Sequence, residues 1–309
     1  MDEHTNHTRP PHSHPEHGAN HHLHFESPMM AELAELEGEV FLGMATEAIS
    51  VLADLCGKHG LRVHRLLDLG CGPGVGTCCL AQRFDSARVV AADGSTTMLG
   101  HVTARAERLG LAERVETRLV EFPDGLGELG RADAAWASMA IHHVGDEVEA
   151  LRRIRSLLEP GGLLALVERA GPLRVLPEDD DLGRPGLWER LDAAWDAWFT
   201  DMRADLPGAV TSADYPTMLE EAGFELEADR VLAQVLAAPL EAPVRRFAHG
   251  QLERTAAQLE SHASDADLKA LGVLIDETAD EGILHRDDAV LSASRHLYVA
   301  RAPETHAAR

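Results

Sequence analysis

The sequence contains very little lysine and carries a large excess of acid. Of its 309 residues, 28 are basic, and only two of these are lysines, Lys58 and Lys269. Acidic residues number 52, which gives a formal net charge of −24. A field this negative repels phosphate backbones, so nucleic acid is disfavoured as a partner. The charge of the whole chain favours a neutral or cationic small molecule over a polyanion, although a local basic groove is compatible with it.

Long apolar runs and paired cysteines are also missing. No stretch of about 18 apolar residues occurs, so no membrane span is predicted, and the polar N-terminus lacks the apolar segment of a secretory signal. The four cysteines, Cys56, Cys71, Cys78 and Cys79, form no CxxC pair and no metal-ligand spacing. A reduced, cytoplasmic location and no bound metal are the expectation.

Residues 1–26 are polar and hold eight of the eighteen histidines. They have almost nothing to bury, so a disordered tail is predicted. A metal-binding role for these histidines stays open, but no ligand spacing repeats and a solvated tail is favoured. The acidic run at 178–181 is likewise expected to be a solvated surface.

From residue 65 onward, short apolar runs alternate with segments of helical period. Strands are predicted at 65–69, 87–93, 114–121, 132–138 and 162–168, with helices at 76–84, 96–109 and 146–159. This alternation is typical of a parallel sheet with crossover helices. The predicted fold is therefore α/β, a Rossmann-like doubly wound and mostly parallel sheet.

The flanking segments predict helical additions and an antiparallel last strand. Helices are expected in 27–60, at 187–203, in 211–224 and through 243–280, and strands at 224–236 and 292–302. The expected organisation is a tail (1–26) and one domain (27–309). That domain has N-terminal helices (27–60), a central core (61–170), a helical insertion (171–212) and a C-terminal part of the sheet (213–309) that carries the insertion 243–280.

The stretch "RLLDLGCGPGVGT" places glycines on alternate positions immediately after an apolar strand. Glycine lets the backbone turn tightly and lets a ligand approach it, and the helix that follows offers unpaired N–H groups. The dinucleotide fingerprint GxGxxG fails in both frames, because its third glycine would fall on Val75 or Thr77. A nicotinamide enzyme is therefore disfavoured.

The segment "LLDLGCGPG" resembles motif I of the class I S-adenosylmethionine-dependent methyltransferases. Three further segments, "VVAADGSTTML", "ADAAWASMAIHHV" and "LRRIRSLLEPGGLLALVE", resemble later parts of that family in the same order. Together the matches cover roughly residues 65–170. The resemblance implies S-adenosylmethionine as cofactor, with contacts from Asp68, Gly70, Cys71, Gly72, Gly74, Asp93, Gly94, Glu121, Phe122, Ser138 and Met139.

Two acids of this region also have a direct physical interpretation. Asp93 ends an apolar strand nineteen residues after Gly74, where a carboxylate can accept both hydrogen bonds of a ribose diol. The alternative is a helix N-cap. Asp68 lies in an otherwise apolar strand; the resemblance implies that it faces the methionine end of the cofactor, and it could also brace the glycine loop. Glu121 and Phe122 are expected to end the third strand beside the adenine.

His142 and His143 follow the fourth strand, at the edge of the sheet where ligands bind. Oxygen and nitrogen acceptors lose a proton when they are methylated, and a histidine with a pKa near neutrality suits that step. Either ring is a candidate general base. The alternative is that one ring packs and hydrogen-bonds within the loop.

Three of the four tryptophans lie in the segment 186–202 at helical spacing. Packing against the sheet or against a second copy in a homodimer is one interpretation of this apolar face. A lid over an acceptor pocket is the other.

These features predict an S-adenosylmethionine-dependent methyltransferase that acts on a small, non-acidic molecule, with oxygen, nitrogen and carbon acceptors all open. The arginine-rich, lysine-poor composition resembles bacterial enzymes from GC-rich genomes, and a natural-product role is an analogy on that basis. The alternatives are a protein or RNA methyltransferase and a non-catalytic module that binds the cofactor.

Overall fold

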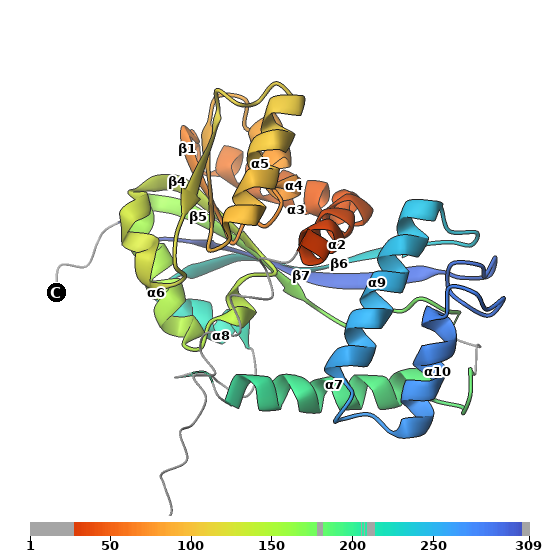
Figure 1. The fold of residues 1–309 in the computed structure, drawn as a ribbon. Helices are drawn as coiled ribbons and strands as arrows, with labels where there is room; N and C mark the ends of the chain where they lie inside the picture. Colours follow the sequence, from red (N-terminus) through yellow and green to blue (C-terminus); the bar gives the residue numbers. More distant parts are fainter. Residues whose placement is uncertain (1–27, 178–181, 205, 207, 209–213, 305–309) are drawn as a thin grey trace, which may run out of the picture.

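In the computed structural model, residues 28–177, 182–204, 206, 208 and 214–304 are described. They form a seven-stranded sheet of order β3-β2-β1-β4-β5-β7-β6, flanked by helices (Figure 1). The strands are β1 (Arg65–Leu69), β2 (Arg88–Asp93), β3 (Val115–Leu119), β4 (Ala132–Ser138), β5 (Leu158–Arg169), β6 (Glu225–Leu236) and β7 (Leu291–Arg301). The predicted tail (1–26) and the acidic run (178–181) lie outside the described residues.

The first five strands are parallel, and the strand order reverses between β1 and β4. β1 pairs with β2 on one side and with β4 on the other. Ligands bind outside the carboxyl ends of the strands at such a switch point. The strands run apolar because helices cover both faces, and Leu66, Leu67 and Leu69 of β1 are fully buried. The predicted fold class is confirmed.

β7 is antiparallel to both of its neighbours and separates β5 from β6. The antiparallel last strand is therefore as predicted. β5 begins at Leu158, four residues before the predicted start, because Leu158 pairs with Ala132 of β4. β3 ends at Leu119, so Glu121 and Phe122 follow the strand and do not form its last residues.

The helices lie where the periodicity places them, with polar caps at several starts. They are α2 (Pro28–Val40), α3 (Leu42–Lys58), α4 (Val75–Arg83), α5 (Thr96–Arg108), α6 (Glu147–Leu157), α7 (Leu187–Ala204), α8 (Tyr215–Glu221), α9 (Ala242–Gln258) and α10 (Asp265–Ile275). Side chains of Ser95, Asp146, Asp214 and Ser264 accept hydrogen bonds from the first turns of α5, α6, α8 and α10.

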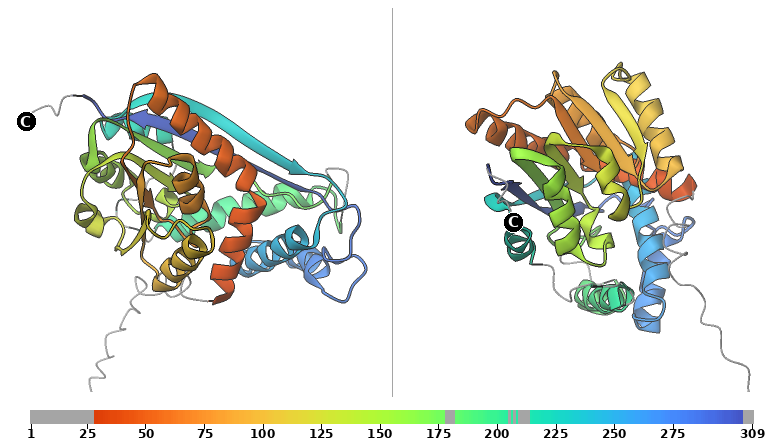
Figure 2. Two further views of the ribbon diagram at one scale, coloured as in Figure 1. Left: turned by 90° about the horizontal axis from the view of Figure 1, so that it is seen from above. Right: turned by 90° about the vertical axis from the view of Figure 1, so that its left-hand side faces the viewer.

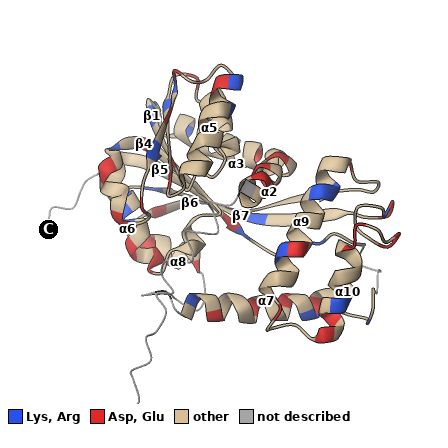
Figure 3. Ribbon diagram, viewed as in Figure 1, with Lys and Arg blue, Asp and Glu red and all other residues tan. Residues whose placement is uncertain are grey.

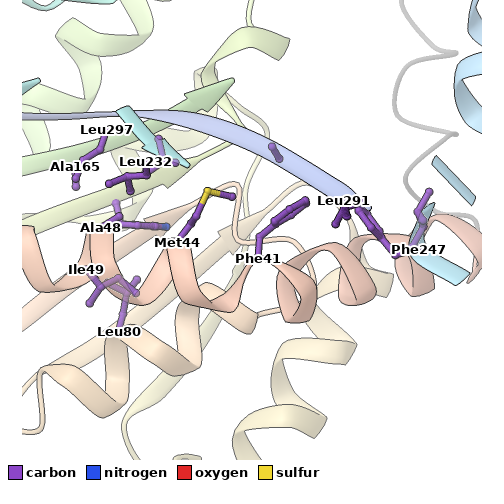
Figure 4. Close-up of a cluster of buried hydrophobic side chains, with 14 of the residues drawn as sticks. Phe41, Met44, Ala48, Ile49, Leu80, Ala165, Leu232, Phe247, Leu291 and Leu297 are labelled. Atoms are coloured by element: carbon purple, nitrogen blue, oxygen red, sulfur yellow. The ribbon is translucent and has the colours of Figure 1, made fainter. Parts of the chain in front are cut away.

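The main core lies on the face of the sheet that α3 and α4 cover. Met44 and Ile49 of α3 pack there with Ala165 of β5 and Leu297 of β7 (Figure 4). A second cluster lies under α6 and α8 on the other face. Figure 2 shows α7 and α9 outside the two layers of helices that cover the faces of the sheet. In the view of Figure 1, α7 lies below the sheet.

Within the described ranges, no single helix is long and apolar enough to cross a membrane; α2 and α3 pass that test only as a pair, bent by 65°. No group of three or more His, Cys, Asp or Glu side chains in the same ranges is placed to hold a metal ion.

Candidate active site

The glycine loop that follows β1 lies against the loop that follows β4. Gly70 has φ +69°, and a Cβ there would lie 2.6 Å from the Cβ of Ala140, so only glycine fits this approach. Gly72 has φ +51° and no atom within 4 Å of the position of a Cβ. Gly74 directly precedes α4. The loop therefore presents bare backbone to open space at the N-terminus of a helix, as a ligand-binding loop requires.

The carboxylate of Asp93 is held at the end of β2 by two backbone donors. Gly72 N donates to Oδ2 at 2.9 Å, and Ser95 N donates to Oδ1 at 2.9 Å. The side chain thus ties the glycine loop to the neighbouring strand and is fixed in orientation. Carboxylate oxygens at a strand end are acceptors of the kind that a ribose diol needs. The N-cap of α5 is Ser95, not Asp93.

Asp68 is buried beneath the glycine loop, with 1% of its surface exposed. The hydroxyl of Thr77 in α4 donates to its Oδ2 at 2.5 Å. Burial raises the pKa of Asp68 to about 7, and the hydrogen bond from Thr77 opposes that rise only in part. A buried carboxylate with one donor among the described residues is poorly stabilised as an anion, which leaves it suited to a cationic partner.

Cys71 and Gly94 complete the loop and strand ends around Asp93. The amide of Cys71 donates to the carbonyl of Ala92 at 3.1 Å, and burial raises the pKa of its thiol. The thiol of Cys71 is therefore unreactive. Gly94 is exposed directly after β2. Glu121 is exposed and Phe122 half-buried in the turn after β3, on the far side of β2 from the glycine loop.

Ser138 ends β4, and Met139 begins the turn into the two histidines. Met139 has φ +55°, an unusual value for a residue with a side chain. Its amide donates to the carbonyl of Val167 in β5 at 2.8 Å. The turn is thus anchored to the neighbouring strand in a strained conformation, a feature that clusters at functional sites.

His142 is oriented by a buried acid that the sequence pattern did not single out. Nδ1 of His142 lies 2.7 Å from Oε2 of Glu168, while Oε1 of Glu168 accepts the amide of Ile141 at 3.0 Å. Glu168 is 2% exposed, near the end of β5. Because a carboxylate accepts the proton on Nδ1, Nε2 of His142 is left as the basic nitrogen. The ring of His143 lies 4.0 Å from that of His142.

The C-terminal turns of helix α7 lie against the turn that holds His142 and His143. Nη1 of Arg203 donates to the carbonyl of His142 at 2.6 Å, and the same guanidinium pairs with the buried Glu147. The ring of Phe199 lies 6.4 Å from that of His142. Burial raises the pKa of Glu147, and the charge of Arg203 opposes the rise. The last turns of α7 are therefore fixed against the histidine turn.

The structure thus collects most of the predicted residues at one edge of the sheet. The glycine loop, Asp93 and the turn after β4 come together around the switch point, whereas Glu121 and Phe122 stay at its margin. Glu168 and Arg203 also belong to the candidate site, although the sequence analysis did not predict them. Glu168 ends an apolar strand, a pattern that it shares with Asp93 and that is its only signal in the sequence.

This strand order, with the glycine loop after β1 and the acid at the end of β2, defines a class I, Rossmann-like methyltransferase fold. Residues 66–162 match the family model described as a methyltransferase domain. This match confirms the resemblance found in the sequence.

Curated relatives match the same region. A trans-aconitate 2-methyltransferase of Paracidovorax citrulli is 38% identical over 101 residues, which is 33% of this chain and 37% of the relative. An uncharacterised 37.1 kDa protein in transposon TN4556 of Streptomyces fradiae is 31% identical over 151 residues, 44% of this chain and 43% of the relative. The chain spans less than half the length of these two relatives.

Among solved structures, an O-methyltransferase family protein from Burkholderia thailandensis aligns with a TM-score of 0.47 and 18% identity, over 67% of this chain and 58% of the other.

Proposed function

We propose that the protein transfers a methyl group from S-adenosylmethionine to a small-molecule acceptor that loses a proton in the reaction. The observation that carries the proposal is the pair of the open backbone at Gly72 and the carboxylate of Asp93, fixed to each other by a 2.9 Å hydrogen bond. A nucleoside placed over the loop meets bare main chain on one side and a ribose acceptor on the other.

The residues fit the cofactor by charge as well as by shape. Asp93 would accept the ribose hydroxyls, and the open face of Gly72 leaves room for a ligand. Asp68 is a buried carboxylate whose one described donor is Thr77, and the ammonium group of the methionine moiety would supply the missing positive partner. The cofactor supplies a methyl group on a sulfonium, and the chain supplies binding, alignment and proton removal.

The proton acceptor in this proposal is Nε2 of His142. Glu168 holds the ring in one tautomer and stabilises the imidazolium that forms when the acceptor loses its proton. The 2.7 Å contact between Nδ1 and Oε2 supports this role. We assign the role of base to His142 because Glu168 orients its ring.

Helix α7 is the proposed lid of the acceptor pocket. The hydrogen bond from Arg203 to the carbonyl of His142 and the 6.4 Å separation of the Phe199 and His142 rings support this role. A cover that excludes water favours transfer to the acceptor over loss of the methyl group to solvent. One relative named above is a trans-aconitate 2-methyltransferase, which supports a small-molecule acceptor. The acceptor atom and a role in natural-product synthesis stay predictions.

The test is a methyl-transfer assay with purified protein, S-adenosylmethionine and a fractionated metabolite extract. We expect S-adenosylhomocysteine to accumulate together with a product heavier than its precursor by one CH₂ group. His142→Gln should lower turnover at saturating cofactor by about 10²-fold or more, and His143→Gln should not. Binding of the cofactor with no turnover in any fraction would favour the non-catalytic module.

A further inference from the structure

A group of arginines lies on the side of β5 opposite to Glu168. Successive residues of a strand point to opposite faces, so Arg169 faces α2, α7 and α9 whereas Glu168 faces His142. Arg169 is paired in register with Arg295 of β7. Its guanidinium carbon lies 4.3 Å from the centre of the Trp195 ring of α7. Figure 3 shows basic positions where β7 passes α9, above α7.

The charges in this group do not balance within the described residues. Arg295 donates to Glu37 of α2 at 2.6 Å, and Arg174 pairs with Asp192 of α7. These two pairs use the nearby carboxylates. Arg169 has no ion pair or side-chain hydrogen bond in the described part of the chain, although it is buried enough to lower its pKa, together with the charge of Arg295, to about 10.

A second arginine, Arg254, adds to the excess of positive charge. Arg254 of α9 contributes positive charge at Arg169, and its Nε is buried without a hydrogen-bond partner in the described ranges. Two cations thus share this space with no carboxylate of their own, in a chain whose net charge is −24. Both arginines are half-buried. Unpaired charge that is partly removed from water is costly, and both guanidinium groups remain charged at neutral pH. An anion from outside would relieve that cost.

Two aromatic rings of α7 lie between the unpaired guanidinium and the proposed proton acceptor. The Trp195 ring that lies under Arg169 also stacks on Phe199, with ring centres 4.9 Å apart, and Phe199 lies 6.4 Å from His142. Glu168, the partner of His142, directly precedes Arg169 in β5. An acceptor that lies along these two rings would meet Arg169 at one end and His142 at the other.

We propose that Arg169, assisted by Arg254, binds a carboxylate of the methyl acceptor, so that the acceptor is an organic acid whose reacting group is directed towards His142. This inference rests on the proposed function of the site. It reverses the expectation of a non-acidic acceptor, which followed from the net charge of the chain. The field of distant charges is screened within about 10 Å at ordinary salt, so the two nearby arginines outweigh it. A guanidinium matches a carboxylate with two parallel hydrogen bonds.

The test compares carboxylates with an uncharged analogue by calorimetry in the presence of saturating S-adenosylhomocysteine. The probes are benzoate, trans-aconitate and benzamide, and the variants are Arg169→Gln, Arg254→Gln and the exposed control Arg152→Gln of α6. We expect at least one carboxylate to bind wild type at least tenfold more tightly than benzamide. That preference should be lost in Arg169→Gln, weakened in Arg254→Gln and kept in Arg152→Gln.

Two readings separate this inference from the proposed function and from misfolding. S-adenosylhomocysteine should bind all variants as it binds wild type, and the unfolding midpoint of Arg169→Gln should be unchanged or higher, since an unpaired cation is removed. If neither acid binds better than benzamide, or if Arg169→Gln binds the acids as wild type does, the anion site is wrong. If wild type fails to bind S-adenosylhomocysteine, it is the proposed function that fails.

Discussion

Replacement of Asp68 by asparagine should make the unliganded protein more stable and the cofactor complex weaker. Asparagine keeps the shape and an oxygen for the hydroxyl of Thr77 but removes the buried charge. Burial raises the pKa of Asp68 from the usual 3.8 to about 7. A pKa higher in the folded than in the unfolded state means that the folded protein binds the proton more tightly. Stability is therefore lost as the pH rises from about 4 to 7.

The size of the effect follows from the same two values. At about 1.4 kcal/mol per pKa unit, the raised pKa lowers the free energy of unfolding, relative to the fully protonated acid, by about 4 kcal/mol above pH 7 and by about 2 kcal/mol at pH 5. These are upper figures for a fully buried group. Asp68→Asn should recover a large part of this energy at pH 8 and less at pH 5. It should also weaken S-adenosylmethionine binding by about 1.5–3 kcal/mol, the range for a hydrogen bond to a charged group.

The assay is urea unfolding of wild type and Asp68→Asn at pH 5 and pH 8, with cofactor affinity measured by calorimetry at pH 8. The predicted result is a gain in stability that grows with pH, together with a loss of affinity. A variant that is no more stable than wild type at pH 8, or that binds the cofactor as tightly, would refute the assignment of Asp68 as a buried carboxylate that awaits a cation.

Three further changes test other contacts of the site. Glu168→Gln should lower turnover at least tenfold while cofactor affinity stays constant, since it removes the charge that orients His142 and stabilises its protonated form; equal turnover would exclude that role. Gly70→Ala should cost about 2 kcal/mol of stability and weaken cofactor binding, because it combines a positive φ with a 2.6 Å clash. Gly57→Ala, within α3 and open to space, is the control and should stabilise by about 0.5–1 kcal/mol. Arg203→Met should destabilise by about 3 kcal/mol at pH 8 and by less at pH 5, where the buried Glu147 can take up a proton; a pH-independent loss in urea unfolding would contradict this.

The cofactor half of the site was accessible from the sequence because its signals are local. A strand, its glycines and the helix that follows are contiguous, and Asp93 is tied to Gly72 across only 21 positions. Each residue type there meets one physical requirement: glycine allows a positive φ, and aspartate provides a hydrogen-bond acceptor at the end of a strand. The order of β1 to β5 follows from the same alternation of strands and helices.

The acceptor half depends on contacts between distant parts of the chain. Glu168 meets His142 only because β5 lies beside β4, and nothing in the pattern distinguishes it from other acids at strand ends. Arg169, Arg254 and Arg295 come from three separate elements, so their shared excess of charge has no sequence signature. The net charge of the chain points the opposite way, and the predicted preference for a non-acidic acceptor followed from it. Long-range packing, not residue type, determines this half.

The most direct test of the central claim is the affinity of the purified protein for S-adenosylhomocysteine, measured by calorimetry for wild type and for Asp93→Ala. We predict saturable one-to-one binding by wild type and a loss of about 100-fold or more in the variant, since a charged acceptor for two ribose hydroxyls is removed. No measurable binding by wild type, or equal affinity in the two proteins, would contradict the placement of the cofactor between the glycine loop and the end of β2.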